Sequence, residues 1–423
     1  MIPNLITALS GPLGEIEQRL LRAGTVIERW FRLEWLKHTP PFYSSVDIRN
    51  AGFKVAPVDT NLFPGGWNNL PPGMLPAAAR AAAATIRQTR PQARELLLLP
   101  ENHTRNPFYL RNILALQQIL SQAGMAVRLG SLNPDITAPA RVDLPDGQQL
   151  LLEPLVRRDG RLGLEDFDPD IILLNNDLSA GVPDLLQGLA GQTLLPSLHA
   201  GWHVRRKSRH FEAYDKVAER FASVLGIDPW LIGTLCSHCA GVDFGNGQGI
   251  ERLQSKVDAL LARIRHKYQE YGIADQPFVV IKADNGTYGM GIMTVRDASE
   301  LASLNRRTRN KMATIKDGQR VSDVIIQEGV LTQDRLQEAV AEPVVYMMGR
   351  HVAGAFYRAN ASRRVDENLN APGAVFVPMT PQCGSGEPSR FHLYGVIGLL
   401  AALAASCELE PANCDAAQTL ALA

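Results

Sequence analysis

Short apolar strands that alternate with helices are the feature that most constrains this fold. Residues 95–99 and 171–174 are apolar runs of strand length, and each is followed at once by a polar loop. Residues 107–123 lie between them and have helical periodicity. This alternation predicts an α/β protein with a parallel or mixed sheet. Ligands bind at the carboxyl ends of the strands in such sheets, so we expect a site near the loops after Leu99 and Leu174.

Further helices are predicted where apolar residues recur at helical spacing. The first is an amphipathic helix over residues 14–37, and the others are expected at residues 77–90, 211–225 and 250–271. The longest apolar run, residues 395–407, is shorter than the roughly 20 residues that cross a bilayer. It therefore predicts a helix buried in the protein.

Net charge limits the expected binding partners, and cysteine content indicates the cellular compartment. The chain has 423 residues with 43 basic and 43 acidic side chains, so its formal net charge is zero. General binding to nucleic acid or to an anionic membrane needs a basic excess, so we expect neither partner. Five cysteines are too few and too scattered for a disulfide framework. With an N-terminal segment that lacks a basic n-region, this predicts a cytoplasmic protein.

A glycine-rich hairpin is the strongest chemical signal in the sequence. Residues 278–295 read FVVIKADNGTYGMGIMTV, in which one strand ends at Lys282, glycines follow, and a second strand begins at Ile292. Glycines let backbone N–H groups approach phosphate oxygens, and Lys282 adds a positive charge. The segment is neither a Walker A loop nor a Rossmann loop. Taken alone, it is equally compatible with an ordinary tight β-turn.

The strands that follow the hairpin end in polar side chains. Residues 324–328 form a predicted strand that ends in Gln327 and Glu328, and two further predicted strands lead to Arg358. Residues 366–373 (DENLNAPG) are then dense in oxygen ligands, which suit magnesium.

This order of lysine strand, glycine loop, Gln-Glu strand and carboxylate cluster resembles the ATP-grasp ligases. Longer segments are similar to the proteobacterial ATP-grasp (type III) glutamate–cysteine ligases: SSVDIRNAGFKVAPVDTNLFPGGWNNL, LLPENHTRNPFYLRN, GWHVRRKSRHFEAYDKV, IIQEGVLTQDR, EPVVYMMGRHVAGAFYR and DENLNAPG. The resemblance spans about residues 10–405. It implies ATP-dependent formation of γ-glutamylcysteine from glutamate and cysteine, the first step towards glutathione.

The resemblance also implies an ATP-grasp fold with an α/β substrate domain before two subdomains that clamp ATP. The expected parts are an N-terminal substrate-binding domain at 1–200, a linker and helical part at 201–275, a lid with the glycine-rich flap at 276–335, and a catalytic, metal-binding subdomain at 336–423.

Roles carried over from the family fall on matching positions of this chain. Lys282 and Arg358 are the implied catalytic residues. The implied ATP-binding residues are Lys282, Gly286, Thr287, Tyr288, Gly289, Gly291, Gln327, Glu328 and Val330. The implied ligands of Mg²⁺, with Mn²⁺ as the alternative ion, are Glu342, Asp366, Glu367, Asn368 and Asn370. Two departures from the ATP-grasp pattern are Glu342-Pro343-Val344, which replaces Asp-x-Arg, and Asn368-Leu369-Asn370, which replaces Glu-x-Asn.

Two zwitterionic amino acids need anchors of both signs, and two polar segments offer them. The first candidates are Asp47, Arg49, Asn50, Lys54, Asp59, Asn61 and Asn69; the second are Glu101, Asn102 and Arg105; and Arg205 belongs to a nearby basic cluster. A solvated surface is the alternative interpretation of these segments, and the residues do not reveal which segment binds which amino acid.

Three other functions remain open from the sequence. Another ATP-grasp amide ligase, such as a glutathione synthetase-like enzyme, would share the ATP residues and differ within residues 47–106. A small-molecule kinase would stop at phosphoryl transfer. A nucleotide-binding protein without catalysis is disfavoured because the lysine, the glycine loop, Arg358 and the carboxylates are all present.

Overall fold

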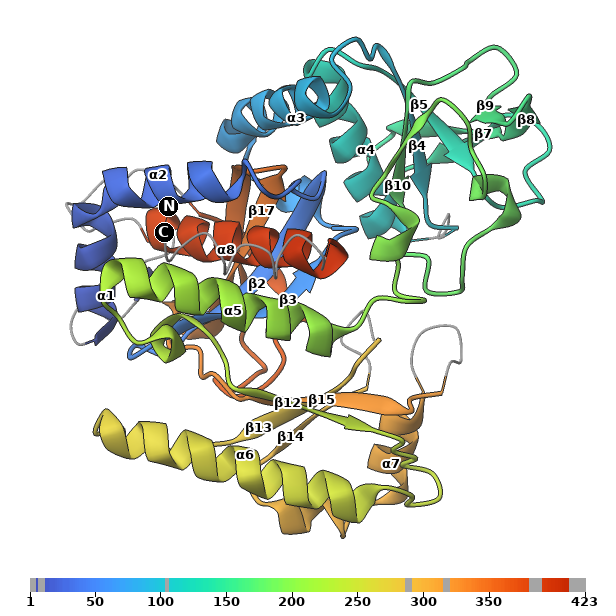
Figure 1. The fold of residues 1–423 in the computed structure, drawn as a ribbon. Coiled ribbons are helices and arrows are strands. Elements are labelled where there is room, and N and C mark those ends of the chain that lie inside the picture. The colour runs from blue at the N-terminus through green and yellow to red at the C-terminus, as the bar shows by residue number, and fades with distance from the viewer. Residues whose placement is uncertain are drawn as a thin grey trace.

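The computed structural model describes residues 5–6, 12–102, 106–285, 291–314, 320–379 and 390–410. It is a mixed α/β protein with three main sheets, as Figure 1 shows. The six-stranded sheet lies at one end, the four-stranded sheet lies at the other, and the seven-stranded sheet lies between them.

The six-stranded sheet contains the strand–helix alternation that the sequence predicts. Its order is β11 (Thr193–Leu195), β10 (Ile171–Asn175), β4 (Glu95–Pro100), β5 (Ala126–Ser131), β7 (Gln149–Pro154) and β6 (Ala140–Asp143). Neighbouring strands run parallel except β6 and β7. Helices α3 (Leu75–Thr89) and α4 (Pro107–Gln122) pack beside this sheet, and β8 (Val156–Arg158) and β9 (Arg161–Gly163) form a separate hairpin.

The seven-stranded sheet joins segments that lie far apart in the sequence. Its strands are β1 (Leu5–Ile6), β16 (Arg335–Leu336), β17 (Ala339–Met348), β18 (His351–Asn360), β19 (Val375–Pro378), β2 (Tyr43–Asn50) and β3 (Val55–Asn61). β2 pairs with β17 in a register that places Asp47 opposite Val344, and β17 pairs with β18 so that Glu342 faces Arg358. Residues from both halves of the chain therefore meet on one sheet.

Helix α8 (Phe391–Leu409) packs on the seven-stranded sheet, and α5 (Lys207–Leu225) packs against α8. In the described part of the chain, α8 is the one helix whose length and composition would suffice to cross a membrane, but 78% of its apolar window is buried inside the protein. This confirms the predicted buried helix at 395–407.

The four-stranded sheet is antiparallel and is covered on one face by α6 (Ile250–Glu270). Its order is β12 (Cys236–Ala240), β15 (Asp323–Glu328), β13 (Val279–Ala283) and β14 (Ile292–Val295). Val279, Ile281 and Ile326 are buried in the same core as the apolar face of α6. Because side chains alternate along a strand, Lys282 and Gln327 lie on the opposite face, towards the rest of the molecule.

The predicted helix over residues 14–37 is interrupted in the structure. It forms two helices, α1 (Pro12–Arg22) and α2 (Gly24–Glu34), separated at Ala23, whose backbone angles (φ −93°, ψ 12°) are not helical. Gly24 favours such a break because glycine loses more conformational freedom in a helix than any other residue. A short helix, α7 (Arg306–Ala313), precedes β15 and carries four basic residues: Arg306, Arg307, Arg309 and Lys311.

The division into 1–200, 201–275, 276–335 and 336–423 stays a prediction. Strand pairing crosses its first and last parts, because β2 and β3 belong to the same sheet as β17, β18 and β19.

Candidate functional site

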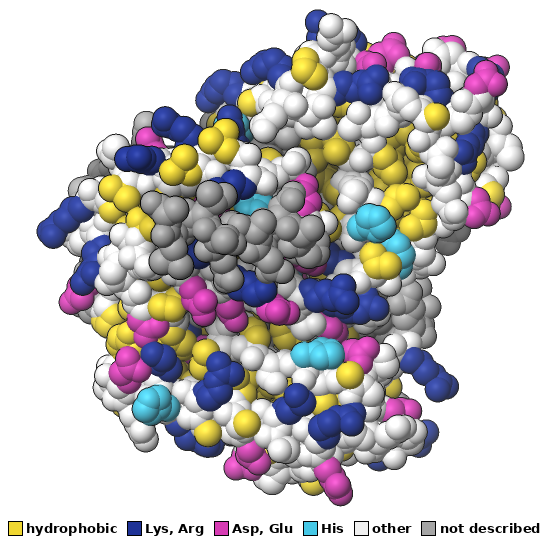
Figure 2. Space-filling model, viewed as in Figure 1, with side chains coloured by type: hydrophobic (Ala, Val, Ile, Leu, Met, Phe, Trp, Pro, Cys, Tyr) yellow, Lys and Arg dark blue, Asp and Glu magenta, His cyan; other side chains and the backbone are white. Residues whose placement is uncertain are grey.

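Two cavities meet between the three sheets. The first lies between the four-stranded and the seven-stranded sheets, and the second lies between the seven-stranded and the six-stranded sheets. Asp47, Asp59 and Asn370 line both cavities, so we call these three residues the junction. Figure 2 shows Lys, Arg, Asp, Glu and His side chains gathered where the lower, four-stranded part meets the rest of the molecule.

The lysine strand and the Gln-Glu strand of the sequence prediction face the first cavity together. Lys282 Nζ donates to Gln327 Oε1 at 2.7 Å and to the carbonyl oxygen of Val58 at 2.7 Å. Burial lowers the pKa of Lys282 to about 8, although the charge of Asp59 opposes this shift. Val330 also lines this cavity, whereas Gly291, a predicted ATP-binding residue, does not; its left-handed φ of 61° suits a glycine.

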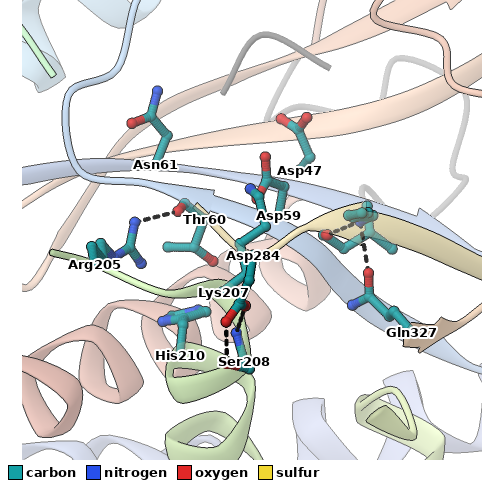
Figure 3. Close-up of polar contacts among 12 residues, drawn as sticks. Asp47, Asp59, Thr60, Asn61, Arg205, Lys207, Ser208, His210, Asp284 and Gln327 are labelled. Atoms are coloured by element: carbon teal, nitrogen blue, oxygen red, sulfur yellow. Dashed lines mark hydrogen bonds and ion pairs between the residues drawn. The ribbon is translucent and has the colours of Figure 1, made fainter. Parts of the chain in front are cut away.

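Asp59 is held between two lysines. Lys207, the first residue of α5, contacts Asp59 through its ammonium group and is itself buried. Burial alone would raise the pKa of Asp59, but the charges of Lys207 and Lys282 lower it to about 2. Figure 3 shows this group with Asp47 beside Asp59. Asp59 therefore stays a carboxylate across the physiological pH range.

Arg358 connects the junction with the Glu-Pro-Val segment. Its Nη1 donates to Asp47 Oδ2 at 2.8 Å and to Glu342 Oε1 at 2.8 Å, and Glu342 Oε2 also accepts from Arg49 Nε at 3.1 Å. Burial raises the pKa of Asp47, and the charge of Arg358 opposes that rise. Arg358 Nε is buried with no partner in the described part of the chain, so one more acceptor could bind it. Arg49 and Arg358 thus place two guanidinium groups against Glu342.

The predicted metal ligands line the first cavity, but several contact other side chains. Asp366 forms an ion pair with Arg296 and a longer one with Arg364 (3.3 Å), and Glu367 Oε2 accepts from the Arg364 backbone N–H at 2.8 Å. Within the described ranges, no group of three His, Cys, Asp or Glu side chains could hold a metal unaided. Magnesium usually takes one or two carboxylates together with phosphate oxygens, so Glu342, Asp366 and Glu367 fit that partial set.

The second cavity collects the polar residues that follow the strands of the six-stranded sheet. Asn61, Asn69 and Glu101 line it, as predicted from the sequence. Asn175, which was predicted to begin the loop and is the last residue of β10, is fixed by several hydrogen bonds, including one from Asn112 Nδ2 to its Oδ1 at 3.1 Å. Residues from the loops after Leu99 and Leu174 therefore line one cavity, and a binding site at these loops stays a prediction.

Some predicted substrate-binding residues lie away from both cavities. Lys54 is fully buried and forms an ion pair with Glu328 at 3.0 Å, Asn50 Nδ2 donates to Asp334 Oδ1 at 2.8 Å, and Arg205 donates to Glu408 at 2.9 Å. None of them lines either cavity, and neither does the exposed Asn102. Lys54, Asn50 and Arg205 instead support the fold around the site, because each bonds to a residue far away in the sequence.

Five predicted residues lie outside the described part of the chain: Arg105, Gly286, Thr287, Tyr288 and Gly289. The sequence prediction also missed residues. Lys207 belongs to the basic run from which Arg205 was chosen. Both residues are buried, but only Lys207 lines the first cavity. Asn175 and Asp177 line the second cavity and directly follow a predicted strand, which was the signal that could have identified them.

Comparison with known proteins gives matches over nearly the whole chain. The family model described as "Glutamate-cysteine ligase" matches residues 17–409. A crystal structure from Methylobacillus flagellatus KT, provisionally named gamma-glutamylcysteine synthetase, is 55% identical, covers 97% of this chain and 99% of its own, and superimposes with a TM-score of 0.89. The comparison with curated proteins gave no match.

Two more distant structures align over much of the chain. They are a glutathione synthetase-like effector from Globodera pallida (10% identity, 89% and 88% coverage, TM-score 0.41) and D-alanyl-alanine synthetase A from Vibrio cholerae (11% identity, 73% and 81% coverage, TM-score 0.35). Similarity at that level does not by itself establish a shared fold.

Proposed function

This chain belongs to the glutamate–cysteine ligase family, and we propose that it joins the γ-carboxylate of L-glutamate to the α-amine of L-cysteine with ATP. The product would be γ-glutamylcysteine, the first intermediate of glutathione biosynthesis. The observation that carries the proposal is the junction, where a cavity lined by Lys282 and Gln327 meets a polar cavity beside Arg358. A ligase of this kind must bring a phosphoryl donor and two amino acids to one point.

ATP is assigned to the first cavity, in an ATP-grasp arrangement of the four-stranded and seven-stranded sheets. Lys282 would neutralise phosphate charge, and the glycines that follow it in the sequence would offer backbone N–H groups to the phosphates. Gln327, Glu328 and Val330 would surround the adenine and ribose. The carboxylate of Glu328 already accepts from Lys54 and from Trp230 Nε1 at 3.0 Å, so it supports the base pocket from behind.

Glutamate and cysteine are assigned to the second cavity. The glutamate γ-carboxylate would lie at the junction, where the unpartnered Nε of Arg358 can bind it and the phosphoryl group can reach it. Ammonium groups would be held by carboxylates such as Asp47 and Glu101, because an ammonium needs an anionic partner once it is desolvated. Asn61 and Asn69 offer amide groups for the α-carboxylates.

A divalent metal, which we propose is Mg²⁺, would be held by Glu342, Asp366 and Glu367 with help from the amides of Asn368 and Asn370. Its chemical contribution when bound is to neutralise the charge of the ATP phosphates. Both Mg²⁺ and Mn²⁺ accept carboxylate and amide oxygens, so the donors alone do not choose between them.

The chemistry follows from the weakness of a carboxylate as an electrophile. Attack of the γ-carboxylate on the γ-phosphorus of ATP would release ADP and form a glutamyl phosphate. The cysteine amine would then attack the carbonyl carbon, and the C–O bond to phosphate would break, which gives the amide and inorganic phosphate. The protein contributes alignment and charge stabilisation through Lys282 and Arg358, and it excludes water from the acyl phosphate.

We place the reaction in the cytoplasm, where the substrate thiol remains reduced. The free thiols of Cys236, Cys239 and Cys407 support this location, because an oxidising compartment favours disulfides.

The deciding experiment follows phosphate release and dipeptide formation with purified protein, ATP and Mg²⁺. We expect both only when glutamate and cysteine are present together. A phosphorylated amino acid as the final product would instead indicate a kinase. Activity only with γ-glutamylcysteine and glycine would indicate a glutathione synthetase-like enzyme.

Substitution of Arg358 tests the residues that we assign. Arg358→Met should lower kcat by about 10²–10³-fold, the usual cost of removing one donor that stabilises developing charge. Arg350→Met, which changes an exposed arginine in the turn between β17 and β18, is the matched control and should keep wild-type kcat. Equal effects of the two substitutions would contradict the assignment.

A further inference from the structure

The Lys207 side chain is buried, although the residue lies at the start of a helix. It is the first residue of α5, yet its side chain is only 7% exposed and lines the first cavity. The ammonium group contacts Asp59 and lies 4.7 Å from the centre of the Trp202 ring. Lysine is rarely buried to this degree unless it is paired, and the partner here is a carboxylate that itself faces both cavities.

The first turn of α5 is fixed by Asp284, the residue that follows β13 and precedes the glycine loop. Asp284 accepts from the Ser208 backbone N–H through Oδ1 at 2.7 Å and from Ser208 Oγ through Oδ2 at 2.7 Å. Its carbonyl oxygen accepts from the Lys207 backbone N–H at 2.8 Å. Figure 3 shows these bonds directly below Asp59. The backbone position of Lys207 therefore depends on the base of the glycine loop.

Two ammonium groups share one carboxylate at this point. Lys207 and Lys282 both act on the carboxylate of Asp59. A buried cation without a full partner is costly, and an incoming anion would relieve that cost. The Lys282 ammonium is already engaged by Gln327 and by the Val58 carbonyl, whereas within the described residues the Lys207 ammonium has Asp59 as its one polar side-chain partner. Lysine has three N–H donors and can therefore bind a phosphoryl oxygen while it still contacts Asp59.

We propose that Lys207 binds the oxygens of the phosphoryl group as it passes from ATP to the substrate carboxylate, and that Asp284 is its positioning residue. This inference rests on the proposed function. The reacting group would thus be contacted by the first residue of α5, in addition to Lys282 on β13 and the glycine loop. It also connects the loop base with the junction, because Asp284, Lys207 and Asp59 form a continuous series of contacts.

The competing explanation is a structural ion pair that only ties α5 to β3. The two explanations differ in their kinetic effects. An interaction made only in the transition state lowers kcat and kcat/KM equally when it is lost, whereas a displaced Asp59 would raise the KM of an amino acid. Loss of a structural tie alone would lower the thermal unfolding midpoint and leave kcat near the wild-type value.

The experiment compares Lys207→Met, Lys207→Arg and Lys216→Met in the full chain with ATP, Mg²⁺, glutamate and cysteine. Lys207→Met should lower kcat about 10²–10³-fold with the KM of both amino acids unchanged within about twofold. Lys207→Arg keeps the charge and should recover at least tenfold of that loss. Lys216→Met, on the exposed part of the same helix, should match the wild type. A Lys207→Met enzyme with kcat within threefold of the wild type would overturn the inference.

A double-substitution cycle tests the positioning role and does not depend on Lys207→Met alone. Asp284→Ala should lower kcat about tenfold in the wild-type background, and it should have almost no further effect beside Lys207→Met, because both changes remove the same contact. Fully additive losses would overturn the link between the two residues. If Lys207→Met unfolds below the assay temperature, the cycle is measured with Lys207→Arg and Asp284→Ala instead. Fully additive losses of kcat in that cycle would likewise overturn the link between the two residues.

Failure of this inference is distinguishable from failure of the proposed function. A wild-type enzyme that forms no dipeptide contradicts the function. A wild-type enzyme that forms dipeptide beside an equally active Lys207→Met variant contradicts only the role of Lys207.

Discussion

Burial sets the chemistry of Lys282. The side chain is only slightly exposed, and desolvation disfavours its charged form, which brings its pKa down to about 8 from the ordinary value near 10.5. A phosphate ligand needs the charged form. The free enzyme should therefore lose its affinity for ATP as this proton is released, within a pH range that is accessible to experiment.

This gives a pH prediction with a defined sign. Below pH 8 Lys282 is an ammonium in the free enzyme, and above pH 8 it becomes an amine, so kcat/KM for ATP should fall as the pH rises through about 8. In Lys282→Arg the same fall should move upwards by at least one pH unit, because a guanidinium stays charged. Initial rates from pH 6.5 to 9.5 at subsaturating ATP measure this, and identical profiles for the two enzymes would contradict the assignment.

The end of β15 shows how single elements build the site wall. Glu328 accepts from Lys54 Nζ at 3.0 Å, from Trp230 Nε1 at 3.0 Å and from the Leu235 backbone N–H at 2.9 Å. Lys54 lies in the turn between β2 and β3, Trp230 lies in a short 3-10 helix, and Leu235 directly precedes β12. The Glu328 carboxylate at the end of β15 therefore connects these three segments to its own strand. Lys54 also lies 4.0 Å from the centre of the Trp230 ring.

Removal of one partner of this ion pair should destabilise the protein. Lys54→Met leaves the Glu328 carboxylate buried without its cation, and breaking a buried pair in this way typically costs about 3–5 kcal/mol. Lys37→Met removes a half-exposed lysine from Glu34, which keeps Arg220 as a partner at 3.0 Å, and should change the free energy of unfolding by less than about 1 kcal/mol. Urea unfolding followed by tryptophan fluorescence compares the two variants; similar midpoints would show that the buried pair has no such role.

For the whole molecule, local sequence patterns were sufficient for β4, β10 and the helices between strands, because each of these follows from periodicity within one segment. The pairing of β2 with β17 could not be predicted, since Asp47 and Val344 are brought together only by the fold. The same limit explains Lys54 and Arg205. Both were predicted to bind substrate from their residue type, and both are bonded to glutamates hundreds of positions away.

The site residues also divide into those that a local sequence pattern predicts and those that only long-range pairing brings together. Residues within one motif, such as Lys282 and Gln327, were assigned to the same cavity that the structure shows. The junction could not be derived, because it takes Asp47 and Asp59 from the N-terminal strands and Asn370 from the C-terminal loop. Its composition depends on sheet pairing that leaves no local signal.

We propose that the two cavities hold the nucleotide and the amino acids and meet at the reacting carboxylate. A crystal structure with a non-hydrolysable ATP analogue, Mg²⁺ and glutamate tests it most directly. We predict the analogue between the four-stranded and seven-stranded sheets, with its terminal phosphate beside Lys282. We also predict glutamate in the second cavity, with its γ-carboxylate at hydrogen-bond distance from Arg358. Glutamate bound with its γ-carboxylate away from the junction, or the nucleotide outside the first cavity, would contradict the account.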